Sequence, residues 1–597
     1  MTRIALPQTW FWLFAAYLLF GMHFFMHNPG GSGFYLPFNM VGWIFVSLLI
    51  AVGLWQMTHN QRVRFSRFHA LCWLVLGLLF VPLLYPNNTF ADHALPRLAG
   101  AAGGLLLYFS LLQCRFDLQQ RRRLLYLLLA GVSLEILLGL MQYYLLEPGN
   151  GMGYNTSVNR PYGIFQQPNV MASFMATGLM LACYLGLDDK AHRRDRLFWL
   201  WLTTVLFSTP LLLVLLQSRT GQLAGVLGLL LMLPLAWQTN KKRLFIGLGL
   251  VLAGIVTALY SQSLSEGVQR GIEAYANPGY RKGYWQQGLA MIQASPLFGF
   301  GYGDFERQFM EFYNASRVAE GRLPPMEPNL AHPHNELLLW GIEGGLLPVL
   351  AILLAVAGFI RLLSKAPWRH GLALAALVWP IALHSQTEYP FYHSLAHWVT
   401  LLVLLYWVDT RLEQPLERQF RPWLLARFTA VLLPALVIPF MLSGLQTAHV
   451  VTQYERGGYK EPELLLSASN PMAWLTRLEF NAMSLQLAVG QAQQDNDALQ
   501  AYATWAEQFV RHTPRANIYY NLVLALNHLD EQARAERLLA EARHFYPGDP
   551  LLKHDNISQA LRTLEDKRTS QAVGLTPPPE QLGPGPELRD QKVKING

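Results

Sequence analysis

Residues 331–345 read Ala-His-Pro-His-Asn-Glu-Leu-Leu-Leu-Trp-Gly-Ile-Glu-Gly-Gly, and here the chain passes from a long polar stretch into an apolar run. The polar stretch spans about 261–337 and carries two histidines, several arginines and several aromatic residues. Apolar segments long enough to cross a bilayer flank it on both sides, so we interpret it as a large loop on one face of a membrane protein. Ionisable groups at such a boundary cost free energy unless they have a function, which makes the cluster informative.

The composition of the whole chain is that of an integral membrane protein. Hydrophobic residues make up 52% of the 597 positions and charged residues only 14%, against about 25% charged residues in soluble domains. The apolar residues form about thirteen runs of roughly 17–25 residues, which is the length a helix needs to cross about 30 Å of hydrocarbon. We therefore predict an all-α polytopic membrane protein. The runs lie near 10–26, 39–57, 69–84, 97–113, 123–146, 169–187, 197–216, 222–238, 244–260, 338–360, 371–386, 394–409 and 424–446.

The placement of Lys and Arg predicts how these helices are oriented. Basic residues gather in the loops that follow even-numbered runs, including 62–67, 190–196 and 241–243. The alternate loops at 27–38, 85–96 and 386–393 contain neither Lys nor Arg. Because cytoplasmic loops carry the excess of Lys and Arg, we predict a cytoplasmic N-terminus and an outward-facing C-terminal region. In a double-membraned bacterium this means the inner membrane, with the large loop in the periplasm. The net charge of +8 follows from this arrangement, and no nucleic-acid motif accompanies it.

The composition changes after the last apolar run. We predict a transmembrane domain over 1–446, a soluble helical domain over 447–570 on the periplasmic side, and a disordered tail over 571–597 that is charged and rich in Pro and Gly. Within the helical domain, Ala-Asn-Ile-Tyr-Tyr-Asn-Leu-Val-Leu-Ala-Leu (516–526) and Ala-Glu-Arg-Leu-Leu-Ala-Glu-Ala (535–542) have the spacing of a tetratricopeptide-type helical pair. A generic helical bundle explains this spacing equally well.

Two arginines in the outward loops are candidates for binding an anion. Arg219 lies in Gln-Ser-Arg-Thr-Gly (217–221), a short loop between two apolar runs, where it runs against the positive-inside bias. Its planar guanidinium fits phosphate oxygens, although a side chain that only reaches for the membrane interface is the alternative. Arg281 and Lys282 lie among three aromatic residues, and this segment is either part of a site or an aromatic membrane anchor.

His334 is the candidate general base. It lies just before an apolar run, and an imidazole with an unperturbed pKa near 6.5 can accept a proton around neutrality. His332 is two residues away, but zinc-binding helices place their histidines four residues apart and Pro333 intervenes, so we predict no metal site.

Among the carboxylates in or beside the apolar runs, three are considered. Glu135, in the middle of the fifth run, indicates a polar cavity or an internal partner. Glu343 and Glu388 are interpreted as ordinary boundary residues. The chain has no phosphate-binding loop, nucleophile elbow, dinucleotide-binding fingerprint or Cys-x-x-Cys pair. We therefore predict no cofactor, and any chemistry needs a substrate that is already activated.

Three motifs resemble those of one superfamily. His-Pro-His-Asn-Glu-Leu-Leu (332–338), followed by Gly-Ile-Glu-Gly-Gly (341–345), resembles the O-antigen ligase and O-antigen polymerase superfamily. Arg-Pro-Tyr-Gly-Ile-Phe-Gln-Gln-Pro-Asn-Val-Met-Ala (160–172) resembles the signature of bacterial protein O-oligosaccharyltransferases of the PglL type. His-Ser-Gln-Thr-Glu-Tyr-Pro (384–390) is similar to the tyrosine motif of the same group. Together the resemblance covers most of the predicted membrane domain.

The resemblance implies an activity and assigns roles to the residues that match. The activity is metal-independent transfer of a preassembled glycan from undecaprenyl pyrophosphate to Ser or Thr hydroxyls of periplasmic proteins such as pilins. His334 would be the general base, and Arg219 and Arg281 would bind the pyrophosphate. Gln167 and Tyr389 match positions that the family uses to bind or orient substrate. The partners expected are therefore the lipid-linked glycan, an acceptor protein and the bilayer.

Other functions stay open at this point. An O-antigen ligase would attach the glycan to lipid A core, and an O-antigen polymerase would extend it; the Gln-Pro-Asn motif at 167–169 and the C-terminal domain favour the protein ligase over both. A non-enzymatic transporter of lipid-linked glycan with a protein-binding domain would show two related halves and polar residues on both membrane faces. The sequence shows neither.

Overall fold

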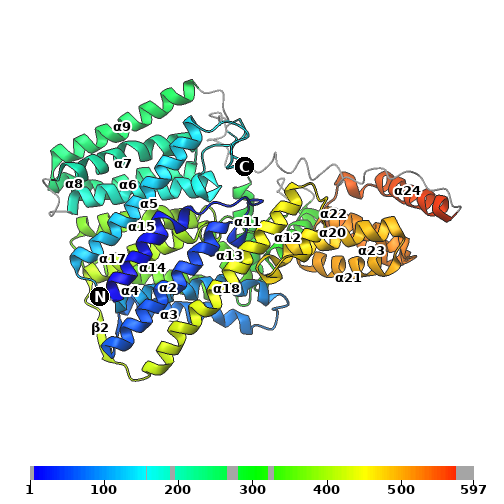
Figure 1. The fold of residues 1–597 in the computed structure, drawn as a ribbon, viewed down its shortest axis with the longest axis horizontal. Coiled ribbons are helices and arrows are strands. Elements are labelled where there is room, and N and C mark those ends of the chain that lie inside the picture. Colours follow the sequence, from blue (N-terminus) through cyan, green and yellow to red (C-terminus); the bar gives the residue numbers. More distant parts are fainter. Residues whose placement is uncertain (1–5, 156, 189–194, 265–279, 321–328, 573–597) are drawn as a thin grey trace. The chain divides into compact units, whose positions relative to one another are not determined.

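The computed structural model describes residues 6–155, 157–188, 195–264, 280–320 and 329–572, most of which are helical (Figure 1). Two compact units are present. The first contains 1–275, 296–302 and 334–475, and the second contains 276–295, 303–333 and 476–597. The second unit therefore includes parts of the predicted large loop. The tail predicted over 571–597 lies almost entirely outside the described residues, and the predicted domain boundaries stay a prediction.

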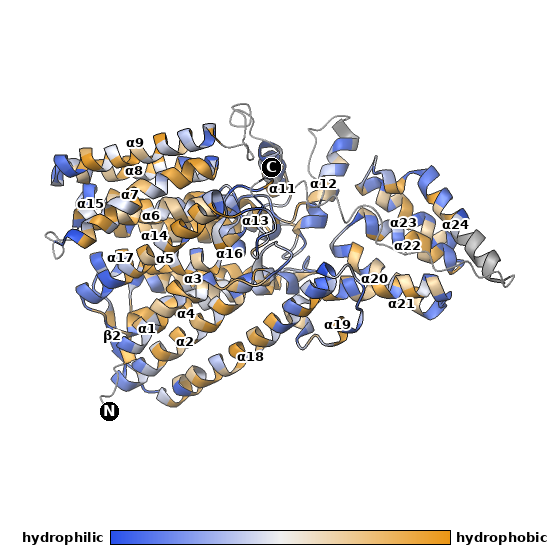
Figure 2. Cartoon of the chain, turned by 45° about the horizontal axis from the view of Figure 1, so that its top comes forward, coloured by the Kyte–Doolittle hydropathy of each residue, from blue (hydrophilic) through white to orange (hydrophobic). Residues whose placement is uncertain are grey.

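Ten of the described helices are long and apolar enough to cross a bilayer, which confirms the predicted all-α membrane fold. Figure 2 shows them as mostly hydrophobic ribbons. They are α2 (Pro37–Asn60), α3 with the turn after it (Arg67–Leu84), α4 with the turn before it (Ala91–Gln113), α5 (Leu118–Tyr144), α6 (Pro168–Asp188), α7 (Arg196–Leu215), α8 (Arg219–Thr239), α9 (Lys241–Ser263), α14 (Leu346–Leu363) and α18 (Trp423–Arg456).

Three further helices occupy segments predicted to span the membrane: α1 (Leu6–Leu19), α15 (Trp368–Ser385) and α17 (Leu395–Leu412). Helix α1 has only 14 residues. Helices α15 and α17 carry polar side chains such as His384, His397 and Asp409, all of them buried within the bundle. The predicted total of thirteen spans therefore stays a prediction.

The apolar run predicted over 338–360 is broken into two helices. Helix α13 (Glu336–Gly344) ends at Gly345, and α14 begins at the next residue. Gly345 has φ +70°, and a Cβ there would lie 2.6 and 2.7 Å from the carbonyl oxygens of Leu297 and Pro296. The Leu346 N–H also donates to the Pro296 carbonyl at 2.8 Å. The break thus arises because the chain at 296–297 lies directly against this corner, which a side chain would prevent.

Helix α6 forms the centre of the first unit. Most of its residues are buried, and it packs against α5, α7, α8 and α15. Glycine permits two of these approaches. A Cβ at Gly178 would lie 2.3 Å from Val132 of α5, and one at Gly221 of α8 would lie 2.4 Å from Ala172 of α6. The second contact matters for the site, because it joins the N-terminal parts of α6 and α8.

The described residues include one small sheet, which the sequence analysis did not predict. Strand β1 (Arg62–Phe65) pairs antiparallel with β2 (Leu416–Gln419), with Arg62 opposite Gln419. Glu417 of β2 lies 3.5 Å from Arg62 and 3.2 Å from Arg115. Four-residue strands in basic loops give no clear periodicity, so such a pair is not visible in the sequence.

The remaining elements are short or belong to the second unit. Helix α16 (Pro390–His393) and helix α19 (Glu463–Leu466) are single turns. Short 3₁₀ turns lie at Gly21–His23, Gly33–Tyr35, Val81–Leu84, Ala91–Ala94, Gly163–Phe165, Pro471–Trp474 and Pro550–Leu552. The helices of the second unit are α11 (Arg281–Ala294), α12 (Phe305–Glu320), α20 (Leu475–Gln493), α21 (Asn496–His512), α22 (Ala516–His528), α23 (Gln532–Phe545) and α24 (His554–Ala572).

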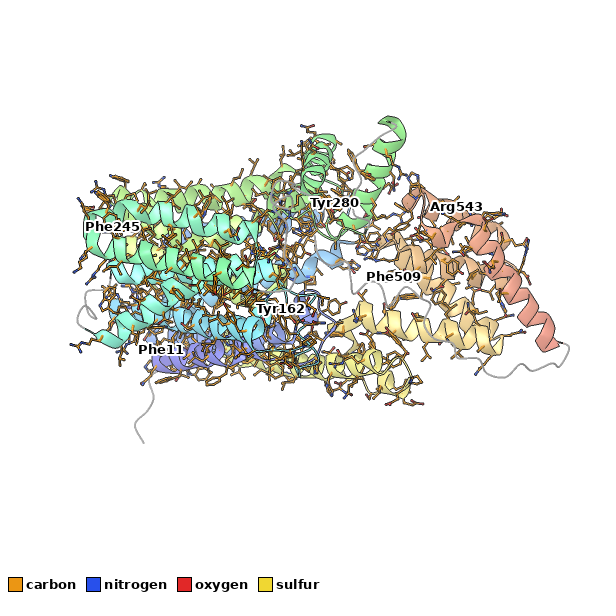
Figure 3. The ribbon with its side chains drawn as sticks, turned by 90° about the horizontal axis from the view of Figure 1, so that it is seen from above. Phe11, Tyr162, Phe245, Tyr280, Phe509 and Arg543 are labelled. Atoms are coloured by element: carbon orange, nitrogen blue, oxygen red, sulfur yellow. The ribbon has the colours of Figure 1, made fainter. Side chains whose placement is uncertain are left out.

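The second unit has its own core. Apolar side chains of α21, α22 and α23, among them Leu499, Tyr519 and Leu526, are fully buried and pack together. These helices alternate hydrophobic and hydrophilic faces (Figure 2), in contrast to the membrane helices. Phe509 of α21 and Arg543 of α23 are labelled in Figure 3. The α22–α23 pair lies where the sequence predicted a helical pair.

Candidate active site

The backbone around His334 is held in an unusual conformation. His334 has φ +54°, in the left-handed region that non-glycine residues adopt only when the surroundings enforce it, often at functional sites. Asn335 fixes the next residues: its Oδ1 accepts from the Leu338 N–H at 3.0 Å and so caps α13, and its Nδ2 donates to the Gln386 carbonyl at 3.0 Å. The His-Asn motif therefore both starts a helix and ties it to the 384–390 motif.

Tyr389 contacts His334 directly. The two rings lie with centroids 5.2 Å apart at an interplanar angle of 65°. On its other side, Tyr389 stacks on His393, with centroids 4.7 Å apart. The His393 Nδ1–H donates to the Gly31 carbonyl at 3.2 Å, and burial lowers the pKa of His393 to about 4, so that this imidazole is neutral at pH 7. Two predicted site residues, His334 and Tyr389, thus lie in one aromatic stack.

Glu388 links the 384–390 motif to the 160–172 motif. Its interpretation as an ordinary boundary residue was wrong. Its side chain is 3% exposed. One carboxylate oxygen accepts from Asn169 Nδ2 at 2.6 Å, and the other accepts from Gln167 Nε2 at 3.2 Å. The other end of the Gln167 amide, Oε1, accepts from the backbone N–H groups of Asn169 and Val170, at 2.5 and 3.3 Å, and so caps α6. Gln167 is therefore held at both ends.

A buried polar chain continues behind Glu388. His384 Nε2 lies 3.4 Å from the Glu388 carboxylate, and His384 Nδ1 lies 2.7 Å from the Ser173 hydroxyl. Ser173 Oγ also lies 3.0 Å from His397 Nε2. The side chains of Ser173, His384 and His397 are fully buried. This chain was not predicted from the sequence, although polar residues inside three apolar runs are the signal that would have revealed it.

Two polar residues of α5 hold the 160–172 motif from behind. Gln142 Oε1 accepts from the N–H groups of Tyr162 and Gly163, and its Nε2 donates to the Gly163 carbonyl. Deeper in the same helix, Glu135 Oε2 accepts from the Ile164 N–H at 3.1 Å, and its other oxygen lies 3.3 Å from His23 Nε2. Tyr162, which belongs to the 160–172 motif, is labelled in Figure 3. The internal partners predicted for Glu135 are therefore the motif backbone and His23.

Arg219 begins α8, at a helix N-terminus. The Ser218 hydroxyl caps this helix by accepting from the Gly221 N–H. Before it, Gln217 has φ +48°, and Arg160 Nη1 donates to the carbonyls of Leu216 and Gln217 at 2.8 and 3.2 Å. Since Gly221 packs on Ala172, the Arg219 turn lies beside the start of α6. A guanidinium at a helix N-terminus suits an anionic ligand, because the helix dipole and free N–H groups add to its charge.

A second buried cluster lies on α13. Arg97 forms an ion pair with Glu343, and its guanidinium lies over the rings of Tyr302 and Trp340, 4.8 and 4.5 Å from their centroids. Glu343 is 3% exposed, so its interpretation as a boundary residue was also wrong. Burial raises the pKa of Glu336 to about 8, although the charge of Arg97 acts in the opposite direction. Arg97 was not singled out from the sequence, because it is the first residue of an apolar run.

Two other predicted residues, Arg281 and His332, belong to the second unit. Arg281 is the first residue of α11 in the second unit, and its role stays a prediction. His332 also belongs to that unit and is 5% exposed. Within the described part of the chain, no group of three or more His, Cys, Asp or Glu side chains is placed to hold a metal ion.

Comparisons with known proteins agree with the motifs. Residues 161–185 match the family described as protein glycosylation ligase, residues 202–354 match O-antigen ligase, and residues 372–558 match the C-terminal part of a virulence factor membrane-bound polymerase. A general O-oligosaccharyltransferase of Acinetobacter baylyi is 28% identical over 289 residues, which are 45% of this chain and 47% of that protein. The matched region thus spans about half the length of this relative. These matches confirm the resemblance to PglL-type protein glycosylation ligases of the O-antigen ligase superfamily that the three motifs carry.

Proposed function

We propose that this protein transfers a preassembled glycan from undecaprenyl pyrophosphate to Ser or Thr hydroxyls of periplasmic proteins, with pilins as a candidate acceptor class. One observation carries the proposal: the segments around Gln167, His334 and Tyr389 meet in one half-buried polar site, through the His334–Tyr389 ring contact and the Gln167–Glu388 hydrogen bond. The named activity of the Acinetobacter baylyi relative supports the same reaction class. We place the protein in the inner membrane, with the N-terminus in the cytoplasm.

The reaction follows from the groups at hand. The acceptor oxygen attacks the anomeric carbon, and the bond from that carbon to the pyrophosphate oxygen breaks, so the pyrophosphate leaves with the electron pair. His334 takes the hydroxyl proton, a role typically worth about 10²–10⁴-fold in rate. Arg219 at the start of α8 stabilises the charge that develops on the pyrophosphate. The leaving group is already activated, so the reaction needs neither ATP nor a metal.

Arg219→Lys should reduce transfer by about tenfold or more, because an ammonium cannot replace two parallel guanidinium hydrogen bonds to phosphate oxygens. The variant retains the positive charge, so a purely electrostatic interface anchor would tolerate it. Initial rates at several donor concentrations, with membrane abundance measured alongside, provide the test. An unchanged rate would mean that Arg219 does not bind the donor.

Tyr389→Phe should retain most activity, whereas Tyr389→Ala should lose about tenfold or more, because the contacts of Tyr389 with His334 and His393 involve its ring. Both variants are compared in the same transfer assay. If Tyr389→Phe proves as inactive as Tyr389→Ala, the hydroxyl itself acts on substrate and the ring-packing explanation fails.

The proposed function is tested by determining which acceptor carries the transferred glycan. The protein is expressed in a bacterial host that lacks its own ligases but makes a lipid-linked glycan and a pilin-type acceptor, and both the pilin and lipid A core are examined. Glycan on the pilin supports the proposal. Glycan on lipid A core alone would make the protein an O-antigen ligase. Transfer to neither, with several glycans and acceptors tried, would favour the transporter interpretation.

A further inference from the structure

Helix α12 comes from the large loop but is built into the C-terminal helical unit. Phe305 and Phe309, one turn apart, are 3% and 0% exposed. Met310 belongs to the same apolar core as Leu499, Tyr519 and Leu526 of the C-terminal helices. Helix α12 packs against both α21 and α23. A segment predicted from the sequence to lie in a large polar loop is therefore held in a folded domain by buried apolar area.

Arg307 fixes the polar side of this contact. Its Nη1 donates to the Val510 carbonyl at 3.1 Å, and its Nη2 donates to Glu541 Oε1 at 3.0 Å. The guanidinium also lies 5.2 Å from the centroid of the Phe545 ring. The same Glu541 oxygen accepts from the Tyr519 hydroxyl at 2.9 Å. One loop residue thus engages the backbone of α21 and two side chains of α23.

The start of α12 is held separately. Glu306 forms a two-pronged ion pair with Arg515, one arm of which is 3.3 Å long. The His512 Nε2–H donates to the Gly303 carbonyl at 2.6 Å. Both partners lie at the junction between α21 and α22. Bidentate guanidinium–carboxylate contacts of this kind fix orientation as well as position.

Helix α11, which begins with Arg281, is joined to α12 in turn. Gln287 Nε2 donates to the Phe309 carbonyl at 2.6 Å. The Tyr284 ring packs on Phe309 with centroids 6.3 Å apart, and Tyr280 stacks on Tyr284 at the same centroid separation. Figure 3 labels Tyr280 at the start of this helix. A continuous set of contacts therefore runs from the C-terminal helices through α12 to the residue before Arg281.

We propose that the C-terminal helical domain holds in place the part of the large loop that carries Arg281, which the resemblance implies binds the donor pyrophosphate. Glu306 and Arg515 are then positioning residues for Arg281. This rests on the proposed function. A loop of this length, left free, would lose conformational entropy each time it closed on the donor. When α11 and α12 are held in a folded unit, this loss of conformational entropy occurs during folding and not during donor binding. Preorganisation of this kind raises reactivity. The domain then acts on the donor side of the reaction and is needed with every acceptor.

The test reverses the Glu306–Arg515 ion pair in the full-length protein. Glu306→Arg and Arg515→Glu are measured singly and together, with a short acceptor peptide and with a full-length acceptor protein, over a range of lipid-linked donor concentrations. Arg537→Glu, an exposed charge reversal on α23, is the matched control. Each single variant should raise the donor KM about fivefold or more with both acceptors, and the double variant should return it to near the wild-type value.

A double-mutant comparison tests the proposed route, in which the Glu306–Arg515 pair acts through Arg281. If the pair acts through Arg281, adding Arg281→Ala to Glu306→Arg should cost no more than the larger single effect. Fully additive losses would overturn this route. Loss confined to the full-length acceptor would overturn the proposal in favour of acceptor docking, and wild-type kinetics in both single variants would overturn it outright. Failure of the proposed function is recognised separately, because the wild-type protein would then transfer glycan to neither acceptor.

Discussion

We expect His334→Ala to abolish nearly all glycan transfer while leaving the amount of protein in the membrane unchanged. The imidazole is the candidate base for the acceptor hydroxyl, so its removal should lower kcat by about 10²–10⁴-fold. The fold should tolerate the change, because His334 is only half-buried and its neighbour Asn335 supplies the cap of α13 and the link to Gln386. Single-turnover transfer with donor and acceptor at saturation, normalised to membrane abundance, measures this loss.

Two companion variants make the result specific. His334→Gln keeps a polar side chain of similar length but no titratable nitrogen, so it should be nearly as inactive as His334→Ala. His332→Ala removes the other histidine of the motif and should retain transfer. If His332→Ala is the inactive variant, the base has been assigned to the wrong residue. If all three transfer glycan normally, no histidine of this motif acts as the base.

The membrane helices could be predicted because each carries its own signal. Helices such as α5, α6 and α9 are runs of apolar residues whose length is set by the bilayer, and this needs no knowledge of their neighbours. The break at Gly345 could not be predicted in the same way. It depends on the carbonyl groups of Pro296 and Leu297, which the chain brings against α13 from about fifty residues away.

In the site, too, some residues could be predicted from local sequence and others could not. His334, Gln167 and Tyr389 stand in motifs that can be read locally, and the structure brings their segments together. The partners that hold them come from elsewhere: Glu388 becomes important only because Asn169 and Gln167 donate to it, and Ser173 only because two histidines from α15 and α17 reach it. Since these contacts join residues more than 200 positions apart, no local pattern contains them.

The position of Gln167 in the structure predicts an orienting role for this residue. Both ends of its amide are already engaged, Nε2 with Glu388 and Oε1 with the first N–H groups of α6. Glu388→Gln alone should place an amide donor against the Gln167 donor or against Asn169. Gln167→Glu alone should place two carboxylates together in a buried site. Each should lose about tenfold or more of the transfer rate, because unmet buried polar groups cost about 1–3 kcal/mol.

The double variant Gln167→Glu with Glu388→Gln exchanges the two groups and should recover both stability and most transfer. The carboxylate then at position 167 can still cap α6, because it accepts from the Asn169 and Val170 N–H groups as an amide oxygen does. The amide then at position 388 can donate to that carboxylate and still accept from Asn169. His384 can change tautomer, accepting at Nε2 and donating from Nδ1 to Ser173, whose hydroxyl then donates to the Val170 carbonyl, 3.0 Å away.

Thermal unfolding of the detergent-solubilised protein and the transfer rate are measured together for the two single variants and the double variant. Recovery of both quantities means that Gln167 acts by fixing the start of α6 and the Glu388 side chain beside Tyr389. A double variant that recovers its thermal stability but not its transfer rate would contradict this, because the groups then missing from their own positions are the Gln167 amide and the Glu388 carboxylate. That result would place one of these two groups in direct contact with substrate and would require their hydrogen bond to open when the donor binds.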